Sequence, residues 1–321
     1  MAKIKVGVVR GGPSSEYEVS LETGKAVLQA LDRNRYEPID VLIDKEGAWH
    51  LSGIVVSPEK VFRVVDVIFN ALHGEYGEDG MVQRLLERHA IKYTGSGTAA
   101  SAVAMQKRLA REIFKLAGIH IPPTLIVKKG DDISIFAAEA IRRMSLPLVV
   151  KPASRGSSIG VTHAKNIYEL VLGMENAFRC DKEVLVEKYI EGREATCALL
   201  EDFRGEKHYT FPVIEIIPPP KKSFFDYECK YDGSTQEICP GRFSVDVRDK
   251  IQKAAIAAHA SLGCRHYSRS DFIVSPDNKV YILELNTLPG LTSQSLAPKA
   301  AAAIGLEFPE LLDHLITLAL R

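Results

Sequence analysis

The first third of the chain alternates between apolar runs typical of strands and amphipathic stretches typical of helices. Apolar runs with the length of buried strands occupy residues 4–9, 39–43 and 65–71. Periodic segments between and after them predict helices over 18–31 and 80–89. Because such alternation is typical of parallel sheets, residues 1–96 are predicted to form an α/β domain with a parallel sheet.

The rest of the chain predicts two further α/β units, over residues 97–191 and 192–321. In the second unit we expect helices over 99–117 and 135–144 and strands over 124–127, 148–151 and 184–189. In the third unit we expect strands over 194–200, 211–217, 268–274 and 280–286, and helices over 245–262, 296–304 and 309–320. Residues 218–241 have little periodicity and predict a long loop, which in a compact protein is usually functional or disordered.

Composition narrows the class of protein. Of 321 residues, 46% are hydrophobic and 26% charged, as in ordinary globular proteins, and the length predicts two or three domains. The 41 basic and 41 acidic residues cancel, so no overall positive field attracts nucleic acid. No apolar run approaches the length of a membrane span, and the five cysteines lack zinc or disulfide spacing. We therefore expect a cytoplasmic protein without membrane or nucleic-acid partners.

Two strands near the C-terminus carry polar side chains in phase. Side chains alternate faces along a strand, so Glu284 and Asn286 point one way while Leu283 and Leu285 point the other. On the preceding strand, Arg269 and Asp271 share a face in the same manner. Carboxylate and amide oxygens suit Mg²⁺, and the arginine adds a fixed cation. The two strands together predict a site for metal-bound phosphates.

Several loops could supply the rest of such a site. Lys151 ends a strand and enters a glycine- and serine-rich loop, whose backbone N–H groups could hold phosphate oxygens. Glu187 and Glu194 flank a strand end that could bind a nucleoside, although a simple domain connector explains that segment equally well. Glu16 follows the first strand, where open α/β sheets bind ligands; it could hold an ammonium group or serve the helix dipole.

The loop after the third strand is rich in glycine and acidic residues. His73 in this loop could donate a hydrogen bond in the site. We expect Glu78 and Asp79 to cap the helix that follows.

Eight segments together resemble the D-alanine–D-alanine ligases of the ATP-grasp superfamily. They occur in family order from residue 11 to residue 302: GGPSSEYEVSL, ALHGEYGEDG, YTGSGTAASAVAMQK, KPASRGSSIGV, VLVEKYIEGRE, FFDYECKYDGSTQEICP, YSRSDF and LELNTLPGLTSQSLAPKAA. The resemblance implies a three-domain ATP-grasp architecture and ATP-dependent joining of two D-alanine molecules through a D-alanyl phosphate. It also implies ATP between the second and third domains, two Mg²⁺ ions (with Mn²⁺ a possible substitute) and a homodimer.

The resemblance also implies roles for the matching residues. ATP binding falls to Lys107, Lys151, Ser158, Glu187, Lys188, Glu194 and Lys230. Metal binding falls to Asp271, Glu284 and Asn286. The remaining roles are ammonium binding by Glu16, oxyanion stabilisation by Arg269 and the N–H of Gly290, loop closure by Ser157 and Tyr231, and binding of the second substrate's carboxylate by Ser295.

Small departures from the family pattern leave alternatives open. Gln106 stands where the family usually has aspartate, and Ser270 where an apolar residue is common. These changes remove no presumed catalytic group. Lys230 and Tyr231 favour dipeptide over D-lactate products, whereas D-serine is less well excluded. A nucleotide-binding regulatory protein without turnover is the second alternative, and the intact set of Arg269 and the three metal-binding residues argues against it.

Overall fold

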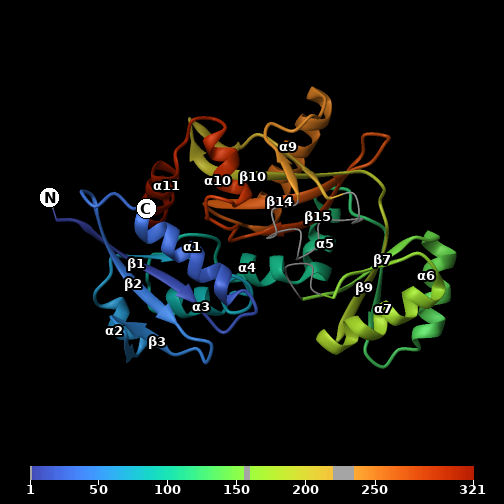
Figure 1. Ribbon diagram of the computed structural model, residues 1–321, viewed down its shortest axis with the longest axis horizontal. Helices are drawn as coiled ribbons and strands as arrows, with labels where there is room; N and C mark the ends of the chain where they lie inside the picture. Colours follow the sequence, from blue (N-terminus) through green and yellow to red (C-terminus); the bar gives the residue numbers. More distant parts are fainter. Residues whose placement is uncertain (1, 155–159, 220–234) are drawn as a thin grey trace.

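The computed structural model describes residues 2–154, 160–219 and 235–321. Three sheets with their helices follow one another along the chain, and Figure 1 shows them as three parts joined by α4 and α5. The two chain termini lie near each other, where α11 approaches the first sheet (Figure 1). None of the helices within the described ranges is long and apolar enough to span a membrane.

The first sheet has the strand order β4-β3-β2-β1-β5. Its strands are β1 (Ile4–Gly11), β2 (Tyr36–Ile43), β3 (Trp49–Leu51), β4 (Ile54–Val56) and β5 (Val67–Asn70). The parallel prediction is correct for β2, β1 and β5, but the short unpredicted strands β3 and β4 extend the sheet antiparallel. The accompanying helices are α1 (Tyr17–Ala30), α2 (Pro58–Phe62) and α3 (Met81–Arg88).

The helix predicted over 99–117 is wrong as a single element. It consists of α4 (Thr98–Met105) and α5 (Lys107–Leu116), separated at Gln106, whose φ of −92° and ψ of 93° are extended. The break frees the N–H of Lys107, which donates to the carbonyl of Ala153 at 3.0 Å. Because this hydrogen bond joins residues far apart in sequence, helical periodicity alone could not reveal it.

The second sheet is antiparallel, with the order β6-β9-β7-β8. Its strands are β6 (Thr124–Lys128), β7 (Leu148–Pro152), β8 (Thr162–Ala164) and β9 (Glu183–Lys188). Helices α6 (Ile133–Met144) and α7 (Ile167–Cys180) cover it, and α7 was not predicted. Leu148, Val150 and Met174 are among the fully buried side chains between the helices and the sheet.

The third sheet is antiparallel and has the order β13-β12-β10-β14-β15, with β11 paired to β10. Its strands are β10 (Arg193–Phe203), β11 (Glu206–Thr210), β12 (Ile214–Ile217), β13 (Gln236–Ile238), β14 (Tyr267–Val274) and β15 (Val280–Asn286). Its helices are α9 (Val245–Leu262), α10 (Leu296–Ala302) and α11 (Phe308–Leu320). The strand predicted over 211–217 is shorter, because residues 211–213 connect β11 to β12.

Two apolar cores pack the third sheet against α5 and against the first sheet. On one side, Phe114 of α5 packs in one cluster with Ile251 of α9 and Phe272 of β14. On the other, Leu315 of α11 lies in one cluster with Val8 of β1. These contacts fix the first sheet and α5 against the third sheet, and thereby set the walls of the cavities described next.

Candidate active site

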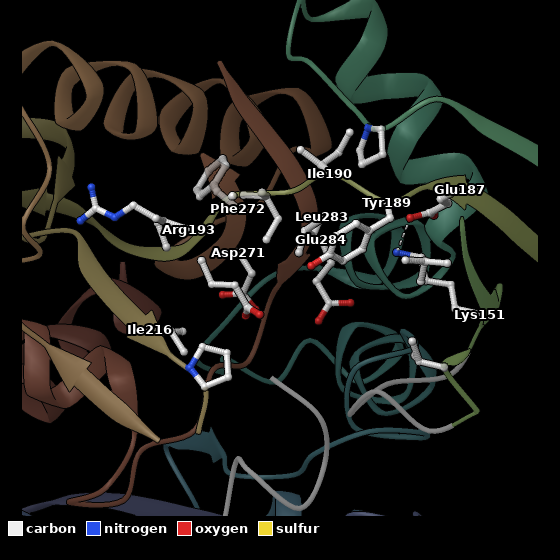
Figure 2. Close-up of a pocket in the computed structure, with 18 of the residues that line it drawn as sticks. Lys151, Glu187, Tyr189, Ile190, Arg193, Ile216, Asp271, Phe272, Leu283 and Glu284 are labelled. Carbon is white, nitrogen blue, oxygen red and sulfur yellow. Dashed lines mark ion pairs between the residues drawn. The ribbon is translucent and has the colours of Figure 1, made fainter. Parts of the chain in front are cut away.

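A cavity of about 410 Å³ lies between the second and third sheets. Lys151 and Glu187 line it from β7 and β9, and Asp271 and Glu284 line it from β14 and β15 (Figure 2). Apolar side chains also contribute to its walls, namely Val149, Val161, Ile190, Ile216, Phe272 and Leu283. A partly apolar lining with charged groups of both signs suits a nucleoside and its metal-bound phosphates.

A second cavity, of about 640 Å³, adjoins the first. Lys107 and Glu284 line both cavities, so the two meet at this pair of side chains. Predicted site residues that line the second cavity are Glu16, Arg269, Asn286, Gly290 and Ser295. The structure therefore brings together residues from the N-terminal loop and the C-terminal strands that the sequence separates by more than 250 positions.

The paired strands β14 and β15 hold the predicted metal-binding residues. Asp271 lies opposite Glu284, and Arg269 lies opposite Asn286. The Arg269 guanidinium donates from Nε to Asp271 Oδ1 at 2.9 Å and from Nη2 to Oδ2 at 2.8 Å. Burial by itself lowers the pKa of Arg269, but the Asp271 carboxylate outweighs it and raises that pKa, so the guanidinium stays charged.

The alternation predicted for β15 fails at Leu283. A bulge opposite Asp271 and Phe272 inserts one residue, since Asp271 pairs with Glu284 whereas Phe272 pairs with Ile282. Ile282 and Leu285 are buried, while Leu283 is half-buried and lines the first cavity with Glu284. The expectation that Leu283 faces away from Glu284 is therefore wrong, and the bulge is what turns Glu284 toward the cavity.

Lys107 begins α5 because the helix breaks at Gln106. Its Nζ lies 3.3 Å from Glu284 Oε2, where the two cavities meet. A continuous helix would lack the hydrogen bond to Ala153 that fixes this end of α5. The break thus positions a cation beside a predicted metal-binding carboxylate.

Lys151 and Glu187 form a buried ion pair with a third member that the sequence analysis missed. Lys151 Nζ lies 3.1 Å from Glu187 Oε2, and Arg111 Nη1 lies 2.8 Å from Glu187 Oε1 without the angle of a hydrogen bond. Arg111 is four residues after Lys107 on the same face of α5, which is the one signal that could have revealed it. Burial and the neighbouring Arg111 lower the pKa of Lys151 to about 8.

Two further predicted nucleotide-binding residues line the first cavity. Glu194 lies on β10, opposite Ile273 of β14. Lys188 lies at the end of β9, and its Nζ donates to the carbonyl of Ser145 at 3.3 Å. Their roles in nucleotide binding stay predictions.

The acidic loop after β5 contributes a residue that the sequence analysis assigned to capping. Asp79 does accept from the N–H of Met81 at the start of α3, at 2.9 Å. Glu78 instead lines the second cavity beside Glu16 and pairs with His73, whose Nδ1 lies 3.4 Å from its Oε1. Burial and the charge of Glu16 raise the pKa of Glu78, which His73 and Arg269 partly oppose.

Gly290 and Ser295 lie in contact in the second cavity. A Cβ on Gly290 would come within 2.7 Å of Ser295 Oγ, so glycine permits this approach. The Ser295 hydroxyl accepts from the N–H of Thr292 at 3.1 Å, which fixes its position before α10. Four predicted site residues, Ser157, Ser158, Lys230 and Tyr231, lie outside the described residues.

Two family models match most of the chain. The family models for the D-ala D-ala ligase N-terminus and C-terminus match residues 5–96, in two overlapping parts, and residues 113–317. The chain belongs to the D-alanine–D-alanine ligase family. The D-alanine–D-alanine ligase of Geotalea uraniireducens is 42% identical over 98% of this chain and 95% of its own length. The D-alanine–D-alanine ligase of Syntrophobacter fumaroxidans is 42% identical over 99% of this chain and 98% of its own length.

Solved structures of this family have the same fold. A D-alanine–D-alanine ligase from Bacillus anthracis, complexed with ATP, has a TM-score of 0.83 at 34% identity, over 99% of this chain and 98% of that one. The VanG D-Ala:D-Ser ligase from Enterococcus faecalis has a TM-score of 0.86 at 33% identity, over 99% of this chain and 100% of that one. The three-domain ATP-grasp expectation for the fold is confirmed.

Proposed function

We propose that this ligase joins two D-alanine molecules to D-alanyl-D-alanine for peptidoglycan synthesis, converting ATP to ADP and phosphate. The observation that carries the proposal is the junction of the two cavities at Lys107 and Glu284. The first cavity suits a nucleotide, and the second has carboxylates, a half-buried arginine and a serine suited to amino-acid substrates. The γ-phosphate of ATP would meet the substrate carboxylate where the cavities join.

The oxygen donors at the junction fit a hard divalent cation. Asp271 accepts three hydrogen bonds, two from Arg269 and one from Thr196 Oγ1 at 2.6 Å, and a carboxylate has about four lone-pair positions. Glu284 lies opposite Asp271, and Asn286 follows two residues later. These three residues would hold Mg²⁺, or Mn²⁺ in its place, and the cation would neutralise charge on the phosphate oxygens.

The protein's own cations would act during phosphoryl transfer. Lys107 and Lys151 line the first cavity and would hold the phosphates of ATP, while Glu187 and Glu194 would bind the nucleoside. The carboxylate of the first D-alanine attacks the γ-phosphorus, giving D-alanyl phosphate and ADP. Glu16, assisted by the nearby charge of Glu78, would hold the ammonium group of that D-alanine.

The second half-reaction would use the other wall of the cavity. The amine of the second D-alanine attacks the acyl carbon, and phosphate leaves as the tetrahedral intermediate collapses. Arg269 and the N–H of Gly290 would stabilise the oxyanion. Ser295, fixed by Thr292, would bind the carboxylate of the second D-alanine.

Phosphate release tests this function directly. The enzyme is incubated with ATP, Mg²⁺ and D-alanine, D-serine, D-lactate or L-alanine, and the products are identified by mass. We expect release that depends on D-alanine, with D-alanyl-D-alanine as the product. Mixed products containing D-serine or D-lactate would change the substrate assignment, and ATP binding without release would favour a non-catalytic binder.

We further propose that the enzyme is a cytoplasmic homodimer of three-domain subunits, with domain boundaries near residues 96 and 191. Each sheet lies within one of these three segments. Among the described residues, Cys197, Cys239 and Cys264 form no disulfide, as in a reducing compartment. Light scattering of the purified protein tests the dimer, and limited proteolysis tests the boundaries.

A further inference from the structure

A second cluster of ligand-type side chains lies on the third sheet, away from both cavities. Glu201 on β10 pairs with His208 on β11 across the hairpin, and His259 of α9 packs against them. Glu201 lies five residues beyond Thr196, which contacts Asp271, so extended geometry places it about 17 Å from the proposed metal-binding residues. The cluster therefore has no part in the reaction described above.

The ligand atoms of the cluster lie close to the separation of ligands around a tetrahedral cation, and small side-chain movements would bring all three onto one ion. His259 Nε2 lies 3.3 Å and His208 Nε2 lies 3.7 Å from the same oxygen, Glu201 Oε1. The ligand atoms of all three residues lie within 4.8 Å of one another. Ligands about 2.0–2.1 Å from a tetrahedral zinc ion are themselves about 3.3–3.5 Å apart. An ordinary ion pair would place one imidazole at Glu201 Oε1, whereas here two imidazoles lie near the same oxygen.

Neighbouring groups orient these side chains as they do around bound metals. Ser268 Oγ lies 2.8 Å from His259 Nδ1, so the ring's other nitrogen, Nε2, faces Glu201. The N–H of His266 donates to Glu201 Oε2 at 2.6 Å, which directs Oε1 toward the two histidines. Ligating histidines and carboxylates typically have such hydrogen bonds at their second atom.

Two nearby histidines, His266 and His314, lie outside this group of ligand atoms. The Nδ1 atom of His266 accepts from the N–H of Gly95 at 3.0 Å, and His314 Nε2 donates to the carbonyl of Glu201 at 2.7 Å. The side chains of Glu201 and His208 are each 19% exposed, whereas His259 is fully buried. A cation could therefore enter from the hairpin side, and water would complete four-coordination.

We propose that Glu201, His208 and His259 bind one Zn²⁺ ion that ties the β10–β11 hairpin to α9. Two imidazoles and a carboxylate favour zinc over magnesium, which prefers all-oxygen sites. Since the ligands come from three separate elements, the ion would stabilise the third sheet without entering the reaction. This site would be occupied in addition to the proposed Mg²⁺ site.

Zinc titration of the chelator-treated full-length enzyme tests the proposal. The titration is followed by calorimetry in buffer with millimolar Mg²⁺, so that the all-oxygen site is kept occupied. We expect one equivalent of Zn²⁺ to bind and to raise the melting temperature. Replacing Zn²⁺ by Co²⁺ should give the visible absorption of a four-coordinate site with nitrogen and oxygen ligands.

Two substitutions make the test specific. His208→Phe keeps a ring packed beside His259, at a present centroid distance of 5.5 Å, but removes the ligand atom. It should weaken Zn²⁺ binding more than about 100-fold and abolish the rise in melting temperature, while Ser268→Ala should weaken binding about 10–100-fold. Turnover of D-alanine by His208→Phe should stay near the wild-type value.

His50→Phe is the matched control. His50 is 20% exposed and pairs with Asp44 at 2.8 Å, but within the described ranges no second histidine pairs with that carboxylate. This variant should bind Zn²⁺ as the wild type does. Absence of stoichiometric Zn²⁺ binding by the wild type, or equal binding by His208→Phe, would overturn the proposal and leave the cluster as an ordinary hydrogen-bonded contact.

Discussion

Replacing Arg269 by lysine keeps a positive charge at the centre of the proposed reaction but removes the planar fork that holds it in place. The arginine makes two parallel hydrogen bonds to Asp271, at 2.9 Å and 2.8 Å, and its side chain is only 14% exposed. Lysine could retain one of these contacts at most, and a hydrogen bond to a charged group contributes about 1.5–3 kcal/mol.

The expected effect on rate follows from these contacts. Loss of one charged hydrogen bond would lower the rate about 10–100-fold, since 1.4 kcal/mol corresponds to a factor of about ten. Loss of an oxyanion donor typically lowers kcat about 10²–10³-fold. The two effects involve one side chain and do not simply add, so we expect kcat for Arg269→Lys to fall about 10²–10³-fold.

Arg10→Lys provides a matched control for this measurement. Arg10 makes the same two-point contact with Asp40, at 2.7 Å for each bond, and lines neither cavity. Coupled ADP-release kinetics should show kcat within about twofold of wild type for Arg10→Lys, with both variants folded by circular dichroism. If kcat of Arg269→Lys stays within fivefold of wild type, the oxyanion role is refuted.

Three further predictions concern individual contacts in the site. Because the pKa of Lys151 is lowered to about 8, its side chain becomes neutral as pH rises through 8. Calorimetry of the nucleotide-free enzyme should therefore show weaker ATP binding at pH 9 than at pH 7, and a smaller pH dependence for Lys151→Arg. If the pH dependence of ATP binding is the same in Lys151→Arg, the proposed role of Lys151 is contradicted. Asn286→Ala should raise the Mg²⁺ concentration for half-maximal turnover about tenfold or more, and an unchanged Mg²⁺ requirement would remove this residue from the metal site. Gly290→Ala would place a methyl group 2.7 Å from Ser295 Oγ and should raise KM for the second D-alanine. In the double variant with Ser295→Ala, the free-energy loss in kcat/KM should be smaller than the sum of the losses in the two single variants.

Local patterns in the sequence determined most helices and strands, and the sheet face on which several site residues lie. The shared face of Arg269 and Asp271 followed from strand alternation, and the structure confirms it, since both are half-buried between fully buried neighbours. The parallel core of the first sheet likewise followed from strand–helix alternation. Such features depend only on neighbours along the chain, which is why periodicity reveals them.

Tertiary contacts decided what the patterns could not. The extended residue at Gln106 is accompanied by a hydrogen bond to a distant carbonyl, and the bulge at Leu283 depends on pairing with another strand. The buried contact of Arg111 with Glu187 joins α5 to β9 across 76 positions. Glu78 likewise faces Arg269 only after the first and third sheets pack together.

The same reasoning applies to the cluster proposed as a zinc site. Strand pairing places His208 opposite Glu201, but only the packing of α9 brings His259 to the same oxygen. The sequence showed nine dispersed histidines without the spacing of a metal motif. Spacing along the chain can reveal a metal site when its ligands lie on one helix or strand. Ligands on three separate elements meet only because burial of the apolar core brings those elements together.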